Sequence, residues 1–292
     1  KTRKRKYTTT ILATALLFSL GGCVKDELHD TPHPDTGKVT VTVDWSDRGE
    51  GVDIPAEWTV TMGDYTGTET GTTHTPDYLF NPGSYTLAAY NTPENITVSG
   101  TTATVAPETG NGTYISNVPG WLFTSVQDVT IEADTDYGLT AAMHQQVRQL
   151  TLVIEPTGDA ADRIESIEGA LSGAAGTMDF ATGTYGAASD VALHFTKITE
   201  GSDAGKWTAT VRLLGIAGDT QRLTATLTYA DGNPADTGLE SDLTAALADF
   251  NADKTEPLTL GGTIAETPTE AGVEAGITDW EKIDGGGVDA EM

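Results

Sequence analysis

Hydrophobic and polar residues alternate along most of the chain with a period of two. Val39, Val41, Val43 and Trp45 occupy every second position, with threonine and aspartate between them. This period predicts a strand with one buried and one solvent-exposed face, because successive side chains of a strand point to opposite sides. The pattern recurs in three further sets: Trp58, Val60 and Met62; Tyr85, Leu87 and Ala89; and Val126 or Val129 to Ile131.

Turn-forming residues separate these predicted strands. They occur at Gly63-Asp64, Asn81-Pro82-Gly83-Ser84, Asn111-Gly112 and Val118-Pro119-Gly120. Glycine, proline and small polar residues favour tight turns. Several short strands joined at such spacing are typical of a sandwich or a barrel. We therefore expect a first β unit over residues 38–142.

A second set of alternating segments begins near Met143 and predicts a second β unit over residues 143–292. Alternation is clearest at 147–154, 191–198, 207–214, 221–229 and 257–264. Residues 163–171 fit either one or two helical turns or a strand, and we favour a strand. The expected fold class is therefore all-β, with two tandem antiparallel β-sandwiches. No disulfide staples them, because Cys23 is the only cysteine.

One short helix is expected in the second unit. Three features predict it: Ser241 is a good N-cap, Asp242 lies near the positive end of the helix dipole, and apolar residues follow at helical spacing, at Leu243, Leu247 and Phe250. Beyond residue 264 the chain becomes an acidic, glycine-rich tail that keeps Trp280. Because an exposed tryptophan is costly, this tail either packs back on the domain or docks on a partner.

The start of the chain has a different pattern. Five basic residues lie within positions 1–6, and an apolar run follows at 11–20. This is typical of a signal peptide, and the run is too short to span a bilayer. Leu20, Gly21, Gly22 and Cys23 then match the lipobox of bacterial lipoproteins, where the cysteine is acylated and the chain is cut before it. We expect 1–22 to be removed and Cys23 to carry the lipid. The alternative is a free thiol in an uncleaved leader.

Residues 23–37 are polar and contain two prolines, which predicts a flexible tether after the lipid. Within the tether, Lys25, Asp26 and Glu27 resemble the signal that sends lipoproteins of Bacteroidota to the outer face of the outer membrane. This resemblance implies an outer-membrane lipoprotein that faces the cell exterior. The alternative interpretation is that these charges only keep the tether solvated.

Acidic residues dominate the charge. The chain has 16 basic and 43 acidic side chains and a net charge of −27. Five of the basic residues lie in the leader, so the remainder has 11 basic against 43 acidic side chains and carries −32. A field of this sign repels phosphate backbones and anionic lipid headgroups. We therefore expect no nucleic-acid partner.

No arrangement of residues stands out as catalytic, and we expect no enzyme activity, cofactor or metal site. His29 and His33 have the spacing of a helical metal pair, but prolines between and beside them disfavour the helix. Residues 249–253 imitate the opening of an EF-hand calcium loop. Lys254 and Leu260 then stand where that loop needs glycine and a bidentate glutamate, so the motif fails.

Five phrases, taken in order, resemble the FimB-like fimbrillin-related lipoproteins of Bacteroidota. They lie at residues 20–23, 81–91, 146–152, 170–173 and 276–280. The resemblance covers nearly the whole chain after the leader. It implies two tandem transthyretin-like, Ig-like sandwich domains, an outer-membrane lipid anchor, and a role in the assembly, anchoring or length control of a type V pilus.

The partners implied by this resemblance are fimbrial stalk or accessory subunits. Strand addition is a physically reasonable way to hold them, because an exposed sheet edge presents N–H and C=O groups that a neighbour's strand can pair with. The alternative hypothesis is a lipid-anchored adhesin or glycan-binding module that is not part of a fimbria and binds a host or bacterial surface ligand. Trp121 and Trp280, interpreted as exposed aromatic residues, motivate it.

Overall fold

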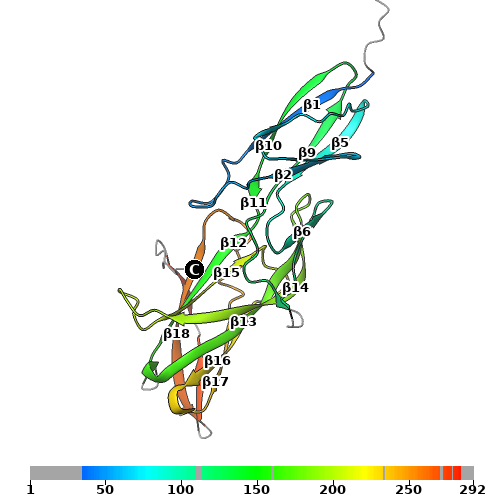
Figure 1. Ribbon diagram of the computed structural model, residues 1–292. Coiled ribbons are helices and arrows are strands. Elements are labelled where there is room, and N and C mark those ends of the chain that lie inside the picture. The colour runs from blue at the N-terminus through cyan, green and yellow to red at the C-terminus, as the bar shows by residue number, and fades with distance from the viewer. Residues whose placement is uncertain are drawn as a thin grey trace, which may run out of the picture.

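The structure is a computed structural model that describes residues 35–109, 114–158, 161–232, 234–269, 272–277 and 279–283. It forms two β bodies arranged end to end in an elongated molecule (Figure 1). The first strand, β1 (Lys38–Asp44), lies in the upper body of the figure, and the last long strand, β18 (Leu258–Thr269), lies in the lower one. The expected all-β fold is confirmed.

The upper body is a sandwich of two sheets. The three-stranded sheet has the order β10 (Asp136–Ala142), β1, β4 (Thr73–His74). The five-stranded sheet has the order β11 (His144–Gln145), β9 (Phe123–Ile131), β5 (Gly83–Tyr90), β2 (Trp58–Met62), β3 (Tyr65–Glu69). All pairs are antiparallel except β1–β10, which is parallel over the full length of both strands.

The alternation seen in the sequence determines the core of this sandwich. The three valines of β1 are at most 5% exposed and share one hydrophobic cluster with β2, β5 and β9. In β9 the core-facing side chains are Phe123, Val129 and Ile131. Val126 therefore lies on the opposite face of the sheet, because side chains alternate along a strand.

The lower body is one sheet that closes on itself. Its circuit runs β13 (Ile164–Asp179), β16 (Arg222–Tyr229), β17 (Thr237–Asp242), β19 (Gly272–Gly276), β18, β12 (Arg148–Pro156), β15 (Trp207–Leu213), β14 (Thr184–Lys197) and back to β13. The strand predicted at 163–171 is thus part of β13 from Ile164 onward, and Arg163 ends the preceding 3-10 helix. Three pairs in this sheet are parallel rather than antiparallel: β12–β18, β17–β19 and β14 with β8 (Tyr114–Ile115).

A segment from the N-terminal half of the sequence joins the lower sheet. β6 (Ile96–Ser99) pairs with β7 (Thr102–Val105), and β7 pairs with the far end of β13. β8 pairs with β14. The chain therefore leaves the upper body after β5, contributes three strands to the lower sheet, and returns as β9. The division into units at 38–142 and 143–292 stays a prediction.

The short helix expected at residues 241–250 does not form. Ser241 lies in β17, and its hydroxyl donates to the Ile277 carbonyl oxygen at 2.7 Å instead of capping a helix. Residues 244–250 form a run of turns, in which the Leu247 amide donates to the Leu243 carbonyl. Leu243, Leu247 and Phe250 are still at most 1% exposed. Their spacing predicted the buried face correctly, but tertiary packing of so short a run replaces consecutive helical hydrogen bonds. The described residues contain two 3-10 helices, Ala161–Arg163 and Ala230–Gly232, and no α-helix.

The described part of the tail packs back on the lower body. β20 (Trp280–Lys282) pairs with β18, and the indole nitrogen of Trp280 donates to Ser241 Oγ at 2.8 Å. The Trp280 ring packs against the main hydrophobic cluster. The sequence left open whether this tryptophan packs back on the domain or docks on a partner. The structure shows that it packs back on the domain.

A small set of polar side chains joins the two bodies. Gln145 accepts a hydrogen bond from the Gly49 amide of the upper body at 2.9 Å, and its own amide donates to the Lys254 carbonyl oxygen of the lower body at 2.6 Å. Gly49 must be small here, because a Cβ atom would lie 2.5 Å from the Thr255 carbonyl oxygen. Trp121 packs against the hydrophobic clusters of both bodies. The orientation of the two bodies is therefore fixed by hydrogen bonds as well as by apolar contact.

Two basic side chains, one buried and one partly buried, lie under this junction. Arg148 is 6% exposed. Its guanidinium donates to the carbonyl oxygens of Glu256 at 2.7 Å and Phe250 at 2.8 Å. The Lys254 ammonium donates to the Leu214 carbonyl at 2.9 Å. Burial, with the positive charge of Arg148 nearby, lowers the pKa of Lys254 to about 7.

The lowered pKa of Lys254 predicts a pH dependence of stability. Between pH 7 and the ordinary lysine pKa of 10.5, the unfolded chain holds a proton on this residue that the folded chain has released. The contribution of Lys254 to the unfolding free energy should therefore rise with pH, by up to about 1.4 kcal/mol per pH unit. Lys254→Met removes this slope. Urea unfolding of both proteins across this pH range measures it, with Lys197→Met as the control for losing one lysine. Parallel curves for wild type and Lys254→Met would refute the assignment.

Candidate functional site: an open edge of the upper sandwich

One side of the upper sandwich is closed by a side-chain network. On edge strand β3, Tyr65 Oη lies 2.5 Å from Nε2 of His74 on β4, and the two rings stack with centroids 5.9 Å apart. Nδ1 of His74 lies 3.4 Å from Glu69 Oε2. β4 pairs with β1 of the other sheet. The network therefore ties the two sheets together along this side.

The electrostatics of this network fit a structural role. Hydrogen bonds from the backbone amides of Gly71 and Thr70, with a further one from His74, hold the pKa of the Glu69 carboxyl below its ordinary value. Burial, with Asp77 nearby, raises the pKa of Tyr65, so the phenol stays a neutral donor. A tyrosine nucleophile would need the opposite shift.

Glycine at position 67 makes room for this network. A Cβ atom on Gly67 would lie 2.3 Å from Tyr65 Oη and 2.8 Å from His74 Nε2. Both side chains therefore lie over one face of β3 at this point. The network ties this face to the other sheet, while the outer edge of β3 pairs with no strand of the described residues.

The opposite side of the sandwich is open. β9 and β10 are consecutive strands, but they belong to different sheets, and β10 pairs with β1 alone. β9 pairs with β5 on one side, while on the other side its pairing with β11 covers only Phe123 and Thr124. From Ser125 onward, no strand of the described residues pairs with this side of β9. The side-chain amide of Gln127 donates to the Thr140 carbonyl at 3.3 Å and so links β9 to β10 without strand pairing.

The hydrogen-bond pattern shows which backbone groups face the open side. The Asn91 amide donates to the Phe123 carbonyl, and the Gln146 amide donates to the Leu122 carbonyl. The backbone carbonyl of Phe123 therefore points toward the β5 side of β9, and that of Leu122 points to the opposite side. Because these directions alternate along an antiparallel strand, the N–H and C=O groups of Val126 and Asp128 point outward. They form a short row of backbone donors and acceptors at an open sheet edge.

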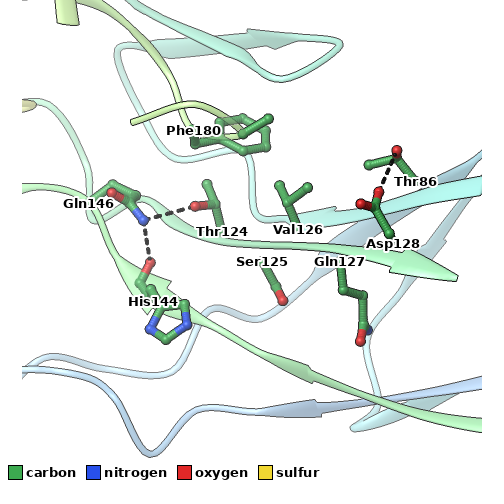
Figure 2. Close-up of a pocket in the computed structure, with 10 residues that line it drawn as sticks. Thr86, Thr124, Ser125, Val126, Gln127, Asp128, His144, Gln146 and Phe180 are labelled. Carbon is green, nitrogen blue, oxygen red and sulfur yellow. Dashed lines mark hydrogen bonds between the residues drawn. The ribbon is translucent and has the colours of Figure 1, made fainter. Parts of the chain in front are cut away.

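A groove of about 440 Å³ follows this edge (Figure 2). Its floor is the consecutive stretch of β9 from Thr124 to Asp128, about 13 Å long at the usual rise of a strand. Phe180 and Ala181, in the turn between β13 and β14, form the wall contributed by the lower body. Figure 2 shows Phe180 above Thr124 and Val126, with Ser125 and Gln127 pointing to the other side of the strand.

Polar side chains define the ends of the groove. At the end nearest the junction, the side-chain amide of Gln146 donates to Thr124 Oγ1 at 2.9 Å and to the His144 carbonyl at 3.3 Å. At the other end, Thr86 Oγ1 donates to Asp128 Oδ1 at 3.0 Å (Figure 2). The groove thus combines an apolar middle, at Val126 and Phe180, with hydrogen-bonding groups at both ends.

His144, which lines the groove, and His194, on β14 of the lower body, each lie against an exposed carboxylate. His144 Nδ1 lies 2.5 Å from Asp47 Oδ2, and His194 Nδ1 lies 2.6 Å from Glu168 Oε2; all four side chains are more than half exposed. Within the described ranges, no group of three histidine, cysteine or acidic residues is placed to hold a metal ion. No helix in that same part of the chain is long and apolar enough to cross a membrane.

Asn251 and Asp253, which imitate part of a calcium loop in the sequence, bond to backbone groups in the fold. Asn251 bonds both the amide and the carbonyl of Ile216, at 2.9 Å each. Asp253 Oδ1 accepts from the backbone amides of Thr255 and Glu256. The Asn251 side chain therefore links this segment to the segment at Ile216, and the Asp253 carboxylate closes a turn.

The site residues predicted from the sequence fall into two groups. The lipobox Leu20–Cys23 and the residues of the export signal, Lys25, Asp26 and Glu27, lie outside the described residues, so they stay predictions. Trp121 and Trp280, expected to be exposed, are instead partly buried against the hydrophobic core. The Arg212 guanidinium also lies 5.4 Å above the Trp121 ring. The open edge of β9 was not predicted, because no local pattern shows that β9 and β10 enter different sheets.

Comparisons with known proteins agree on one family. A model of the fimbrillin-A associated anchor proteins Mfa1 and Mfa2 matches residues 59–284. No curated protein matches the chain. The fimbrial anchor protein Mfa2 from Porphyromonas gingivalis is similar in structure, with a TM-score of 0.56 and 14% identity over 82% of this chain and 95% of that one.

Two other solved structures have a similar fold. A candidate adhesin from Bacteroides ovatus has a TM-score of 0.57 and 16% identity, over 87% of this chain and 97% of that one. A candidate polysaccharide-binding protein from Bacteroides thetaiotaomicron has a TM-score of 0.54 and 10% identity, over 78% of this chain and 92% of that one. At these identities the structures show a shared fold. The family model confirms the fimbrial resemblance found in the sequence and, because it matches more than half of the chain, the protein belongs to the Mfa2 family of fimbrillin-A associated anchor proteins.

Proposed function

We propose that this protein is an outer-membrane surface lipoprotein that anchors or assists a type V pilus, supports cell adhesion, and holds a fimbrial subunit by β-strand addition at β9. The observation that carries the proposal is the unpaired outer edge of β9 in a member of a fimbrial anchor family. The outer side of β3 is the other candidate edge in this sheet, because β3 pairs with β2 alone in the described part of the chain. We choose β9 because the groove follows its open side.

The groove indicates what the incoming strand should look like. Its backbone would pair with the outward groups of Val126 and Asp128, continuing the line that β11 begins at Thr124. Side chains that point toward Val126 and Phe180 would be apolar, since these two residues form the middle of the groove. A hydroxyl or a basic group would suit the end at Asp128. Main-chain bonds would supply affinity and these contacts specificity, as in other cases of strand addition.

The lipid anchor completes the proposal at the other end of the chain. Acylation of Cys23 would place the lipid 12 residues before the first described residue, Asp35. A chain of that length spans at most about 43 Å. Two or three acyl chains contribute about 0.8 kcal/mol per buried methylene, which is enough for permanent attachment. A surface-exposed anchor of this kind would hold a fibre at the outer face of the outer membrane.

A glycan-binding adhesin is the second candidate. The observation in its favour is the same groove, in which the Phe180 ring lies beside hydroxyl, amide and carboxylate groups. Sugar-binding sites commonly combine an aromatic surface with such polar groups. The two candidates respond differently to substitution, because a sugar depends on the Phe180 ring, whereas a strand depends on the backbone N–H of Val126.

Val126→Pro tests strand addition. Proline removes an outward N–H without touching the β5–β9 ladder, and proline is tolerated on the open side of an edge strand. We expect binding of fimbrial subunits to fall roughly 10- to 100-fold, as expected for losing one or two main-chain hydrogen bonds. Co-purification and surface plasmon resonance with isolated fimbrial subunits measure the change.

Thr66→Pro is the matched control for this experiment. By the same alternation, the N–H of Thr66 points outward from the edge of β3, which the proposal excludes as acceptor. Binding by this variant should equal that of wild type. Equal loss in both variants, or no loss with Val126→Pro, would contradict the proposed acceptor edge.

Cys23→Ala tests the lipid anchor. The variant should lose labelling by radioactive palmitate and leave the outer-membrane fraction, because the domain would have no acyl chain to hold it. Surface protease accessibility of the wild-type protein on intact cells tests its outward orientation. Normal palmitate labelling of Cys23→Ala, or an unlabelled wild-type protein, would exclude acylation at this residue.

A further inference from the structure

An exposed apolar pair lies at the end of the upper body where the chain enters it. Leu79 is 55% exposed, the highest value among the large hydrophobic residues that the structure describes, and its neighbour Tyr78 is 42% exposed. Both lie in the loop between β4 and β5, which runs along this end of the sandwich. Single exposed apolar residues are common on protein surfaces, but two adjacent ones, both turned outward, need a reason.

The loop holds this pair in a fixed position. The backbone of the next residue, Phe80, makes two hydrogen bonds to Gly37, of 2.8 and 2.9 Å. The Tyr78 ring contacts the buried Phe80 ring edge-on, with centroids 4.8 Å apart, and lies 5.7 Å from the Tyr65 ring. The Tyr78 ring is thus supported by the buried Phe80 and the partly buried Tyr65, and Leu79 lies between Tyr78 and the hydrogen-bonded Phe80 in the chain.

The pair is also close to the point where the tether would arrive. Gly37 is hydrogen-bonded to the residue next to Leu79, and Cys23 precedes Gly37 by 14 residues. A chain of that length reaches at most about 50 Å. The end of the domain that carries Tyr78 and Leu79 is therefore the end tied to the lipid, if Cys23 is acylated as proposed above.

We propose that Tyr78 and Leu79 contact the lipid surface itself and form a second, non-covalent attachment beside the acyl chains. This inference rests on the proposed lipid anchor. Tyrosine and leucine are favoured where a protein meets the boundary between headgroups and acyl chains. Acyl chains alone leave the domain free to swivel on its tether, whereas a second contact fixes which end faces the bilayer.

The acidic residues at this end of the upper body determine which lipid headgroups it can contact. Lys38 is accompanied by Asp77, Glu132, Asp134 and Asp136, in the loops and strand ends next to Gly37. This acidic surrounding repels anionic headgroups. The contact is therefore with neutral or zwitterionic headgroups, and it depends on the apolar pair rather than on charge.

The contact has a consequence for the open edge of β9. Ile131, the last residue of β9, pairs with Gly83 at the end of the sandwich that carries Tyr78 and Leu79. Thr124, in the groove, lies seven residues away from Ile131 along the strand. At the usual rise of a strand this is about 23 Å. Orientation by Tyr78 and Leu79 would thus keep the groove clear of the bilayer and accessible to a fimbrial subunit.

A single labelled thiol tests the contact. Acylation would consume the thiol of Cys23, so Leu79→Cys introduces the one reactive thiol of the mature lipoprotein. The purified lipoprotein, carrying an environment-sensitive dye at this position, is reconstituted into phosphatidylcholine vesicles with and without a spin-labelled quencher lipid. Val118→Cys, at a residue that is 40% exposed and precedes the junction, is the matched control.

We expect the dye at position 79 to shift to shorter wavelength and to lose roughly half of its emission to the quencher, as for a side chain at the headgroup boundary. The dye at position 118 should change little. Vesicle flotation of the same samples reports the anchor separately. Flotation without quenching at position 79, or equal quenching at both positions, overturns the contact and leaves the anchor intact. Failure of the lipoprotein to float overturns both.

Discussion

The structure depends on one requirement, that the N–H and C=O groups of every strand find partners. The lower body satisfies it by closing its sheet, so that eight strands each have two neighbours. The upper sandwich satisfies it less completely: on one side Tyr65, His74 and Glu69 tie β3 to the other sheet, but the outer edge of β3 pairs with no strand of the described residues. Its other side leaves β9 and β10 as neighbouring open edges. An exposed edge is a risk of aggregation that proteins normally cover, so its presence in a member of an anchor family indicates a use.

The junction between the bodies makes this edge a defined site. Gln145 lies in β11, the short strand that pairs with the first two residues of β9. Its side chain makes hydrogen bonds to both bodies. Phe180 reaches the groove from the lower body because the β13–β14 hairpin extends up to it. Arg148 and Lys254 donate hydrogen bonds to backbone carbonyls, which keeps the turns under the junction in place. The floor of the groove thus comes from the upper body and one wall from the lower body, and the junction holds the two in a fixed arrangement.

The sequence predicted the parts of this structure that follow from local periodicity. Alternation identified β1, β2, β5, part of β9 and, in the lower body, all or part of β12 to β16 and β18, because a half-buried strand must alternate. It did not identify β17 or β19. It did not predict that β6, β7 and β8 leave the upper body, since pairing partners are not encoded in a strand's own pattern. Leu243, Leu247 and Phe250 had helical spacing but form turns, because core packing outweighs propensity over so few residues. Trp121 and Trp280 are covered by contacts that are distant in sequence, and the open edge is itself a property of topology.

The central claim is that the outward backbone groups of Val126 and Asp128 accept a strand. Hydrogen exchange of the amides at these two positions, followed by mass spectrometry with and without a bound fimbrial subunit, tests it most directly. The account predicts exchange that slows by at least about tenfold at both positions on binding, while the amides of Thr66 and Thr68 at the edge of β3 do not change. Unchanged exchange at Val126 and Asp128 in a complex that still forms would contradict it.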